Sequence, residues 1–209
     1  MNVTTNIRVL CVDDHPLFRE GLAAVINSQK DMALVAMAAT GQEALEAFRT
    51  FTPDVTLMDL RLPDMSGIAA ISTIRSEFPN ARAVLLTTFD GDVEIQRALA
   101  AGARGYILKG TPQKDLVWII REIHAGRKHI PSQIAQSLAQ GMGNVLSPRE
   151  LEVLVELADG NRNREIGHRL LISEDTVKAH IRSILDKLGA KDRTQAVAIG
   201  LRRGFIHFD

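Results

Sequence analysis

The sequence predicts a parallel α/β domain followed by a smaller, all-helical domain. In residues 1–125, short apolar runs alternate five times with helical patterns, which is typical of a parallel sheet covered by helices. From residue 146 onward only helical periodicity remains. We therefore expect a first domain over residues 1–125, a linker over 126–145 and a second domain over 146–209.

Each expected strand of the first domain leads into a helix. The strands are expected at Ile7–Val12, Met32–Ala38, Val55–Met58, Ala83–Leu86 and Arg104–Leu108. Proline fits the first turn of a helix, so helices should begin at Pro16 and, with Thr111 as N-cap, at Pro112. The others should begin near Gly41, Ile68 and Val93. The expected arrangement is flavodoxin-like, with strand order 2-1-3-4-5 and a site between the first and third strands.

Glycine and proline punctuate the expected linker, whose one candidate helix is Ser132–Gln140. Beyond it, Ser147–Glu150 matches a capping box, with serine as N-cap and glutamate three residues later. Four helices are expected at Pro148–Asp159, Asn163–Leu171, Glu174–Leu188 and Thr194–Arg203. The very short turn between the second and third of these makes them a helix-turn-helix candidate.

Composition narrows the class of protein. The chain has 209 residues, of which 45% are hydrophobic and 24% charged, as expected for a soluble globular protein. It has no apolar run of the roughly 20 residues that a membrane span needs, and no signal-peptide pattern. Its single cysteine, Cys11, excludes an internal disulfide framework and agrees with a cytoplasmic location. The net charge of zero argues against a general polyanion binder.

Polar residues end the strands at the edge where ligands of such sheets bind. They are Asp13, Asp14, Asp59, Thr87 and Lys109. Three carboxylates in one crevice stay ionised only beside a cation, and hard oxygen ligands suit Mg²⁺. The lysine and the threonine suit phosphoryl oxygens. Singly, each is more often a helix cap, a strand residue or solvated surface, so the prediction rests on the whole set.

Several stretches then resemble known families. DDHP, MDLRLPDMSG, LTT and GARGYILKG resemble the receiver domain of two-component response regulators. LSPRELEVL and NREIGHRLLISEDTVKAHIRSILDKLGAKDRTQAV resemble the LuxR-type helix-turn-helix DNA-binding domain. In this order they resemble the NarL/FixJ subfamily, over almost all of the chain except the linker.

The resemblance implies roles for the strand-end residues. Asp59 would accept a phosphoryl group from a sensor histidine kinase. Asp14 would bind Mg²⁺ or Mn²⁺ directly and Asp13 largely through water, and the backbone carbonyl of Arg61 would be a further ligand. Apart from self-phosphorylation from small phosphodonors and self-dephosphorylation, no enzyme activity is expected.

The resemblance also implies that Thr87 and Lys109 hold the phosphoryl oxygens and that Thr87 and Tyr106 form a switch. Without the resemblance, Tyr106 is better explained as half-buried packing. Many receivers have proline after this lysine, with a cis bond, whereas Gly110 stands here. A cis bond before glycine would cost about 2.5–4 kcal/mol, so we expect trans geometry or strain.

The third helix of the second domain is the expected DNA-reading helix. Its apolar stripe leaves Lys178 and Arg182 together on another face. Residues 176–193 carry five basic and two acidic residues, a net +3, whereas residues 147–209 carry eleven and ten, a net +1. This charge is a modest signal for DNA, and a solvated charged helix would explain it equally well.

By resemblance, Lys178, Ala179 and Arg182 would face base edges of double-stranded promoter DNA. Four further residues would reach phosphates, namely Thr176, His180, Lys187 and Arg193, although His180 also suits packing near the turn. The active protein would be a homodimer that contacts RNA polymerase and no membrane. The dimer face would use small and apolar residues of the last helix, namely Ala196, Val197, Ile199 and Gly200.

Three other readings compete. A dehalogenase-like phosphohydrolase needs a second aspartate two residues after the nucleophile, where Arg61 stands. A phosphorylation-independent regulator would use its first domain only to dimerise, and the intact strand-end set argues against it. The second domain could also bind protein or RNA, which a gel shift comparing promoter DNA with RNA would distinguish.

Overall fold

The computed structural model describes residues 6–88, 92–130 and 146–206. The chain divides into two compact units, one of residues 1–89 and 95–132 and the other of residues 90–94 and 133–209. Within the described ranges, no helix has both the length and the apolar character that crossing a membrane requires. The helix expected at Ser132–Gln140 lies outside the described residues, and the predicted domain boundaries stay predictions.

The first unit is built on a parallel sheet with the order β2-β1-β3-β4-β5, as predicted. The strands are β1 (Ile7–Val12), β2 (Met32–Ala38), β3 (Val55–Asp59), β4 (Ala83–Thr87) and β5 (Gly105–Leu108). Every residue of β3 and β4 is buried. A strand that is covered on both faces reads as a continuous apolar run, which is why these two were visible in the sequence.

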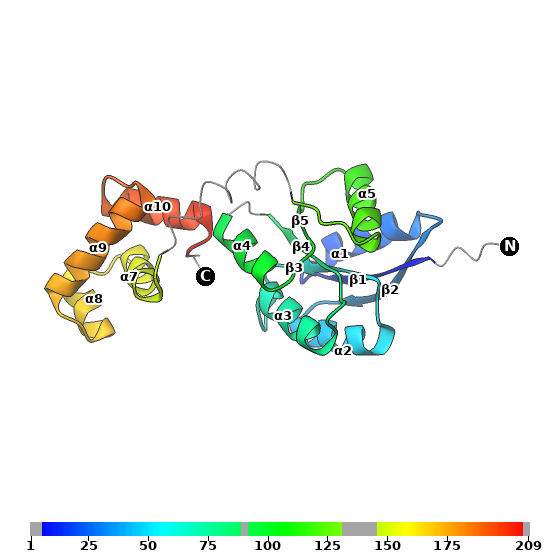
Figure 1. Ribbon diagram of the computed structural model, residues 1–209, viewed down its shortest axis with the longest axis horizontal. Helices are drawn as coiled ribbons and strands as arrows, with labels where there is room; N and C mark the ends of the chain where they lie inside the picture. The colour runs from blue at the N-terminus through cyan, green and yellow to red at the C-terminus, as the bar shows by residue number, and fades with distance from the viewer. Residues whose placement is uncertain (1–5, 89–91, 131–145, 207–209) are drawn as a thin grey trace. The chain divides into compact units, whose positions relative to one another are not determined.

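Five helices follow the five strands: α1 (Pro16–Asn27), α2 (Gly41–Phe51), α3 (Gly67–Glu77), α4 (Asp92–Ala100) and α5 (Gln113–His124). Helices α1 and α5 lie together on one side of the sheet, and α2 and α3 on the other (Figure 1). Alternate strand residues such as Val9, Cys11 and Leu57 share one apolar core with α1 and α5.

Helix α5 begins one residue later than predicted. Pro112 has φ −56° and ψ 143°, so it is the N-cap and not the first helical residue. Beyond α5 the chain turns at Gly126, whose φ is +85°, and returns to the sheet. There His129 forms a parallel bridge with Gly105 of β5.

The second unit contains the four predicted helices, α7 (Pro148–Ala158), α8 (Asn163–Leu170), α9 (Glu174–Leu188) and α10 (Arg193–Arg203). Their shared core includes Val153, Leu154, Ile166, Val177 and Ile184. The predicted capping box is present at the start of α7, where the Ser147 hydroxyl and the Glu150 carboxylate each accept a backbone N–H of the other residue.

Candidate functional site

The strand ends bring the predicted site residues to one edge of the sheet. Asp59 and Thr87 are the last residues of β3 and β4, and Lys109 directly follows β5. The Lys109 N–H donates to the Thr87 carbonyl oxygen at 2.7 Å, which continues the ladder one residue beyond β5. Because neighbouring parallel strands end at the same edge, these side chains converge where open α/β sheets bind ligands.

Lys109 lies between two buried carboxylates. Its Nζ is 2.9 Å from Asp59 Oδ2 and 2.8 Å from Asp13 Oδ2. Asp13 is fully buried, Asp59 is 4% exposed, and Thr87 is also buried. Charges this far from water interact more strongly than surface pairs, so the lysine dominates the electrostatics of the site.

Burial raises the pKa of Asp59; the hydrogen bond from Lys109 opposes this shift, and the negative charge of Asp13 adds to it. Burial would lower the pKa of Lys109, but its contacts with Asp13 and Asp59 outweigh burial and raise that pKa. The lysine is therefore cationic at neutral pH. One lysine is too little positive charge for the carboxylates that gather here.

The acidic residues fit a divalent cation. Oxygen or nitrogen atoms of Asp13, Asp14, His15 and Asp59 all lie within 4.8 Å of one another. Asp13 Oδ2 is buried and accepts no well-directed hydrogen bond from the described residues, although Lys109 lies beside it. Carboxylate oxygens with spare acceptor capacity are the ligands that Mg²⁺ prefers.

Sequence reasoning missed His15. Its Nδ1 lies 2.6 Å from Asp14 Oδ1, and its backbone N–H donates to Asp13 Oδ1 at 2.9 Å. The only signal was its place directly after the two aspartates. In this structure the exposed His15 ring contacts Asp14, whose side chain is also partly exposed.

The loop after β3 is folded tightly against the backbone of the site. The Gly67 N–H donates to the Leu60 carbonyl oxygen at 2.8 Å, and Arg61 bridges to Ser66. A β-carbon at Gly67 would lie 1.9 Å from the carbonyl oxygen of Asp59. Glycine is therefore required here for close approach. The backbone of Arg61 in this loop hydrogen-bonds to the Asp59 carboxylate, which opposes the rise that burial causes in the pKa of Asp59.

The predicted switch residues are buried. Tyr106 is 1% exposed, and it lies on β5 directly across from Leu85 of β4. All peptide bonds among the described residues are trans, including the one between Lys109 and Gly110. Of the two alternatives expected for this bond, trans geometry or strain, the structure has trans geometry.

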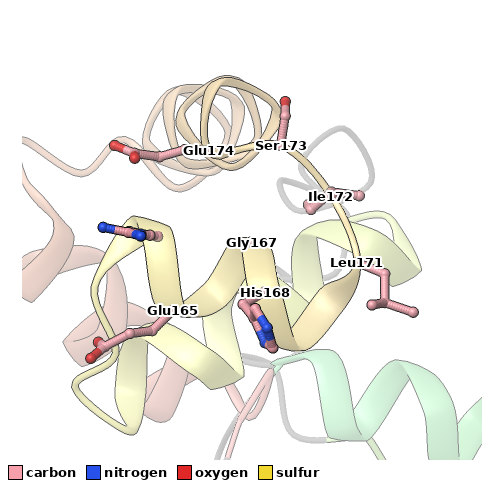
Figure 2. A pocket seen from close by; sticks show the side chains of 8 residues that line it. Glu165, Gly167, His168, Leu171, Ile172, Ser173 and Glu174 are labelled. Atoms are coloured by element: carbon pink, nitrogen blue, oxygen red, sulfur yellow. The ribbon is translucent and has the colours of Figure 1, made fainter.

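The second unit presents a helix-turn-helix. Figure 2 shows the chain running from α8 through Leu171 and Ile172 into α9, with Leu171 pointing away from both helices. Leu171 has φ +56°, and the Ile172 N–H donates to the Gly167 carbonyl oxygen at 2.9 Å. Ser173 then caps α9 by accepting the Thr176 N–H. A shallow groove beside this bend is lined by both helices.

The predicted reading face of α9 is open to solvent. Thr176, Lys178, Ala179 and Arg182 are exposed, whereas His180 is half-buried. Lys178 pairs with Glu174 and Asp175 at 3.2 and 3.1 Å. These exposed positions could reach the major groove, which admits an α-helix.

Two residues that were predicted to contact phosphates are instead paired with other residues of the second unit. Lys187 Nζ lies 2.6 Å from Glu150 Oε2, and the Ser183 hydroxyl donates to Glu150 Oε1 at 2.6 Å. The Arg193 guanidinium donates to the Asn161 carbonyl oxygen at 2.7 Å. Burial would raise the pKa of Glu150, but its hydrogen bonds, led by the one from Lys187, lower it to about 2.

The expected dimer face on α10 needs a correction. Ala196 and Gly200 are buried, and a β-carbon at Gly200 would lie 2.9 Å from Leu154 Cδ2. Residues four apart share a helix face, so both point into the core of their own domain. Val197 and Ile199 also pack against this core but are only half-buried, and for them the dimer face stays a prediction.

Comparison with known proteins agrees with this geometry. Residues 9–121 match the response regulator receiver domain, and residues 144–199 match the bacterial regulatory proteins of the luxR family. The chain is 40% identical to the "Uncharacterized transcriptional regulatory protein YxjL" of Bacillus subtilis (strain 168), over 96% of this chain and 97% of that protein. It is 36% identical to the "Oxygen regulatory protein NreC" of Staphylococcus aureus (strain JH9), over 97% of this chain and 100% of that protein.

Solved structures give the same result. The chain is similar to the response regulator ChrA of a heme-sensing two-component system, with 34% identity, a TM-score of 0.57 and coverage of 96% of this chain and 99% of that one. A receiver domain followed by a LuxR-type helix-turn-helix defines the class. The chain belongs to the two-component response regulators of the NarL/FixJ type, and it is a DNA-binding regulator of transcription.

Proposed function

We propose that a sensor histidine kinase phosphorylates Asp59 and that this modification controls promoter binding by α9. The observation that carries the proposal is the position of Lys109, whose Nζ lies 2.9 Å from Asp59 Oδ2 and 2.8 Å from Asp13 Oδ2. Two buried carboxylates joined through one lysine are costly as structure alone, and they suit a site that binds a compact anion.

In the transfer step, a carboxylate oxygen of Asp59 attacks the phosphorus of a phosphohistidine. The new P–O bond forms as the P–N bond breaks, and the kinase imidazole leaves with the electron pair and takes up a proton. Lys109 moves from Asp59 to a phosphoryl oxygen and offsets its charge. The Thr87 hydroxyl donates to another phosphoryl oxygen.

Asp13, Asp14, Asp59 and the backbone carbonyl of Arg61 would hold Mg²⁺ or Mn²⁺. When bound, this cation neutralises the carboxylates and draws negative charge from the phosphoryl oxygens. His15 would orient Asp14 for this role, in the way that outer-shell groups fix metal ligands.

The switch residues respond to phosphorylation of the site. Thr87 moves toward the phosphoryl group, and Tyr106 occupies the space that it leaves between the sheet and its covering elements. Coupling of this kind is typically about 1–3 kcal/mol, which is enough to shift a balanced equilibrium. Phosphorylation would in this way favour a homodimer that uses the exposed parts of Val197 and Ile199.

The paired output domains would read promoter DNA. Lys178, Ala179 and Arg182 are exposed on α9 and would face base edges, with Thr176 and Arg193 near phosphates. Arg193 and Lys187 would first have to leave Asn161 and Glu150, so we assign Lys187 mainly to the fold of the domain. The bound dimer would act in the cytoplasm by contacting RNA polymerase.

Acetyl phosphate with Mg²⁺, followed by intact-protein mass spectrometry, tests the proposal. The wild-type chain should gain the mass of one phosphoryl group, and Asp59→Asn should gain none. Asp115→Asn makes the same chemical change in the first turn of α5, at a residue outside the acidic cluster, and should behave like the wild type. An unmodified wild-type mass would instead support a phosphorylation-independent regulator.

A further inference from the structure

Residues 128–130 form a short segment, here named the clasp, that is hydrogen-bonded to the edge of β5. The His129 N–H donates to the Arg104 carbonyl oxygen at 3.0 Å. The Tyr106 N–H donates to the His129 carbonyl oxygen at 3.1 Å. These two bonds form the parallel bridge between Gly105 and His129, so that α5 connects β5 to one further strand-like segment.

Local features of the sequence on both sides of this contact favour the clasp. Gly126 adopts φ +85°, a conformation that favours glycine, and Arg127 N–H donates to the Glu122 carbonyl oxygen at 3.0 Å. The Arg127 guanidinium also pairs with the Glu122 carboxylate. A β-carbon at Gly105 would lie 3.3 Å from the His129 carbonyl oxygen, so glycine at this position lets the clasp approach.

A ring contact completes the attachment. The imidazole of His129 and the indole of Trp118 on α5 meet edge to face, with centroids 5.8 Å apart and planes at 84°. Burial lowers the pKa of His129 against the opposing charge of Glu122, so the ring is neutral at physiological pH. Trp118 is 52% exposed and is the only tryptophan of the chain, so it reports on this contact.

The clasp is tied to the residue that is proposed to switch. One of its two backbone bonds is donated by the amide of Tyr106, whose side chain is buried at the same time. Two backbone bonds and one ring contact hold the clasp far more weakly than a full strand is held. A small displacement of β5 is therefore sufficient to change how often the clasp is attached.

We propose that the clasp carries the state of the receiver to the linker, and that it is attached when the Tyr106 side chain is buried. The inference rests on the proposed function, because phosphorylation of Asp59 is what would favour buried Tyr106. Phosphorylation then increases the fraction of molecules in which the clasp is attached to β5. By reciprocity, detaching the clasp must weaken binding at the phosphorylation site by the same factor.

Amide hydrogen exchange in the full chain measures the clasp directly. The amides of Tyr106 and His129 are the two donors, and both should exchange about five-fold more slowly, or slower still, once beryllofluoride and Mg²⁺ are added. Trp118 fluorescence should change in the same titration. Unchanged exchange at both amides, in protein that has bound beryllofluoride, would overturn the inference.

A matched pair of variants tests the reciprocal effect. His129→Pro removes the donor N–H, whereas His129→Ala keeps both backbone bonds and removes only the ring. His129→Pro should raise the midpoint of a beryllofluoride titration, followed by ¹⁹F NMR, about five-fold, and His129→Ala should stay within about two-fold of the wild type. Equal midpoints for the wild type and His129→Pro would contradict the coupling.

If the proposed function itself is wrong, the same experiments give a different result. In that case the wild-type chain neither binds beryllofluoride nor gains mass from acetyl phosphate, and both proposals fall together. If the wild type is modified normally while the clasp amides and the midpoint do not respond, only the clasp proposal is overturned.

Discussion

Lys109 links the two buried carboxylates of the site, so its removal tests the electrostatic part of the mechanism. Lys109→Gln removes the ammonium group that contacts Asp59 and Asp13, so charge on the transferring phosphoryl group would be offset less. Loss of one such preorganised donor typically costs about 10²–10³ in rate, and we expect phosphorylation by acetyl phosphate to slow accordingly. Lys114→Gln, which changes an exposed lysine of α5, should leave the rate unchanged. Equal rates in both variants would show that Lys109 has only a structural role.

Glu150 makes the second domain sensitive to acid. Its pKa is about 2 in the folded state, below the ordinary value of 4.5, because Lys187, Ser183 and Ser147 bind the ionised form. Because this pKa is lowered in the folded state, ionised Glu150 stabilises the fold above pH 4.5 by on the order of 3 kcal/mol. This stabilisation is lost as the pH falls toward 2.

Urea unfolding between pH 2 and pH 5, followed on NMR signals of α7 and α9 in the full chain, measures this effect. Glu150→Gln should be less stable at neutral pH and should lose the pH dependence. Glu152→Gln removes an exposed carboxylate of the same helix, so it should keep the wild-type slope. A wild-type slope in Glu150→Gln would contradict the assignment.

The residues that sequence reasoning identified differ in kind from those that it missed. Asp59, Thr87 and Lys109 were predictable because each stands at the end of an apolar run, and strand ends share an edge. The pairing of Lys187 with Glu150 joins residues 37 apart, and no local pattern encodes it. The sequence carries no separate sign of this pair, because the capping box alone already accounts for a glutamate at position 150.

Gly67, the first residue of α3, shows how the start of a helix can fix the position of site residues that the helix does not itself supply. In Gly67→Ala, the new β-carbon would clash with the Asp59 backbone, 1.9 Å away, and would displace the loop that carries Arg61. A misplacement of about 1 Å can cost roughly 100-fold in rate, so phosphorylation by acetyl phosphate should slow by that order. Gly110→Ala is the control, because a β-carbon there meets no atom within 4 Å. Normal phosphorylation of Gly67→Ala would mean that the loop adapts.

Helix α9 carries the DNA contacts in our proposal. Lys178→Ala should cost about 1–3 kcal/mol at one base position if the residue reads a base, or reduce the salt slope by about one if it contacts phosphate. Quantitative gel shifts on matched promoter fragments at several salt concentrations distinguish these results. Lys114→Ala removes the same charge from α5 and should change neither quantity. No effect of Lys178→Ala would remove this residue from the interface.

The periodicity of the sequence predicted every described helix and strand, and the bounds that it gave are accurate to about one residue. Periodicity could not predict the clasp, because three residues are too short to show alternation. It also could not tell which face of α10 is buried, since Ala196 and Gly200 suit close packing against either a partner or the domain's own core. The small residues were visible, but the surface that they meet is a tertiary property.

At the scale of the whole molecule, two domains with separate cores must share one signal. In our proposal the receiver holds the phosphorylation site and α9 of the second domain contacts the DNA. Phosphorylation must then change dimer pairing, or the access of α9 to DNA, to affect binding. A ligand can shift such an equilibrium only by its differential affinity for the two states. The clasp is our candidate for part of that difference.

Genome-wide binding of the wild-type chain and of Asp59→Asn, under conditions that activate the kinase, tests the central claim most directly. We predict that the wild type occupies a defined set of promoters and that Asp59→Asn, expressed at the same level, loses most of that occupancy. Equal occupancy at the same promoters would contradict control of DNA binding through Asp59.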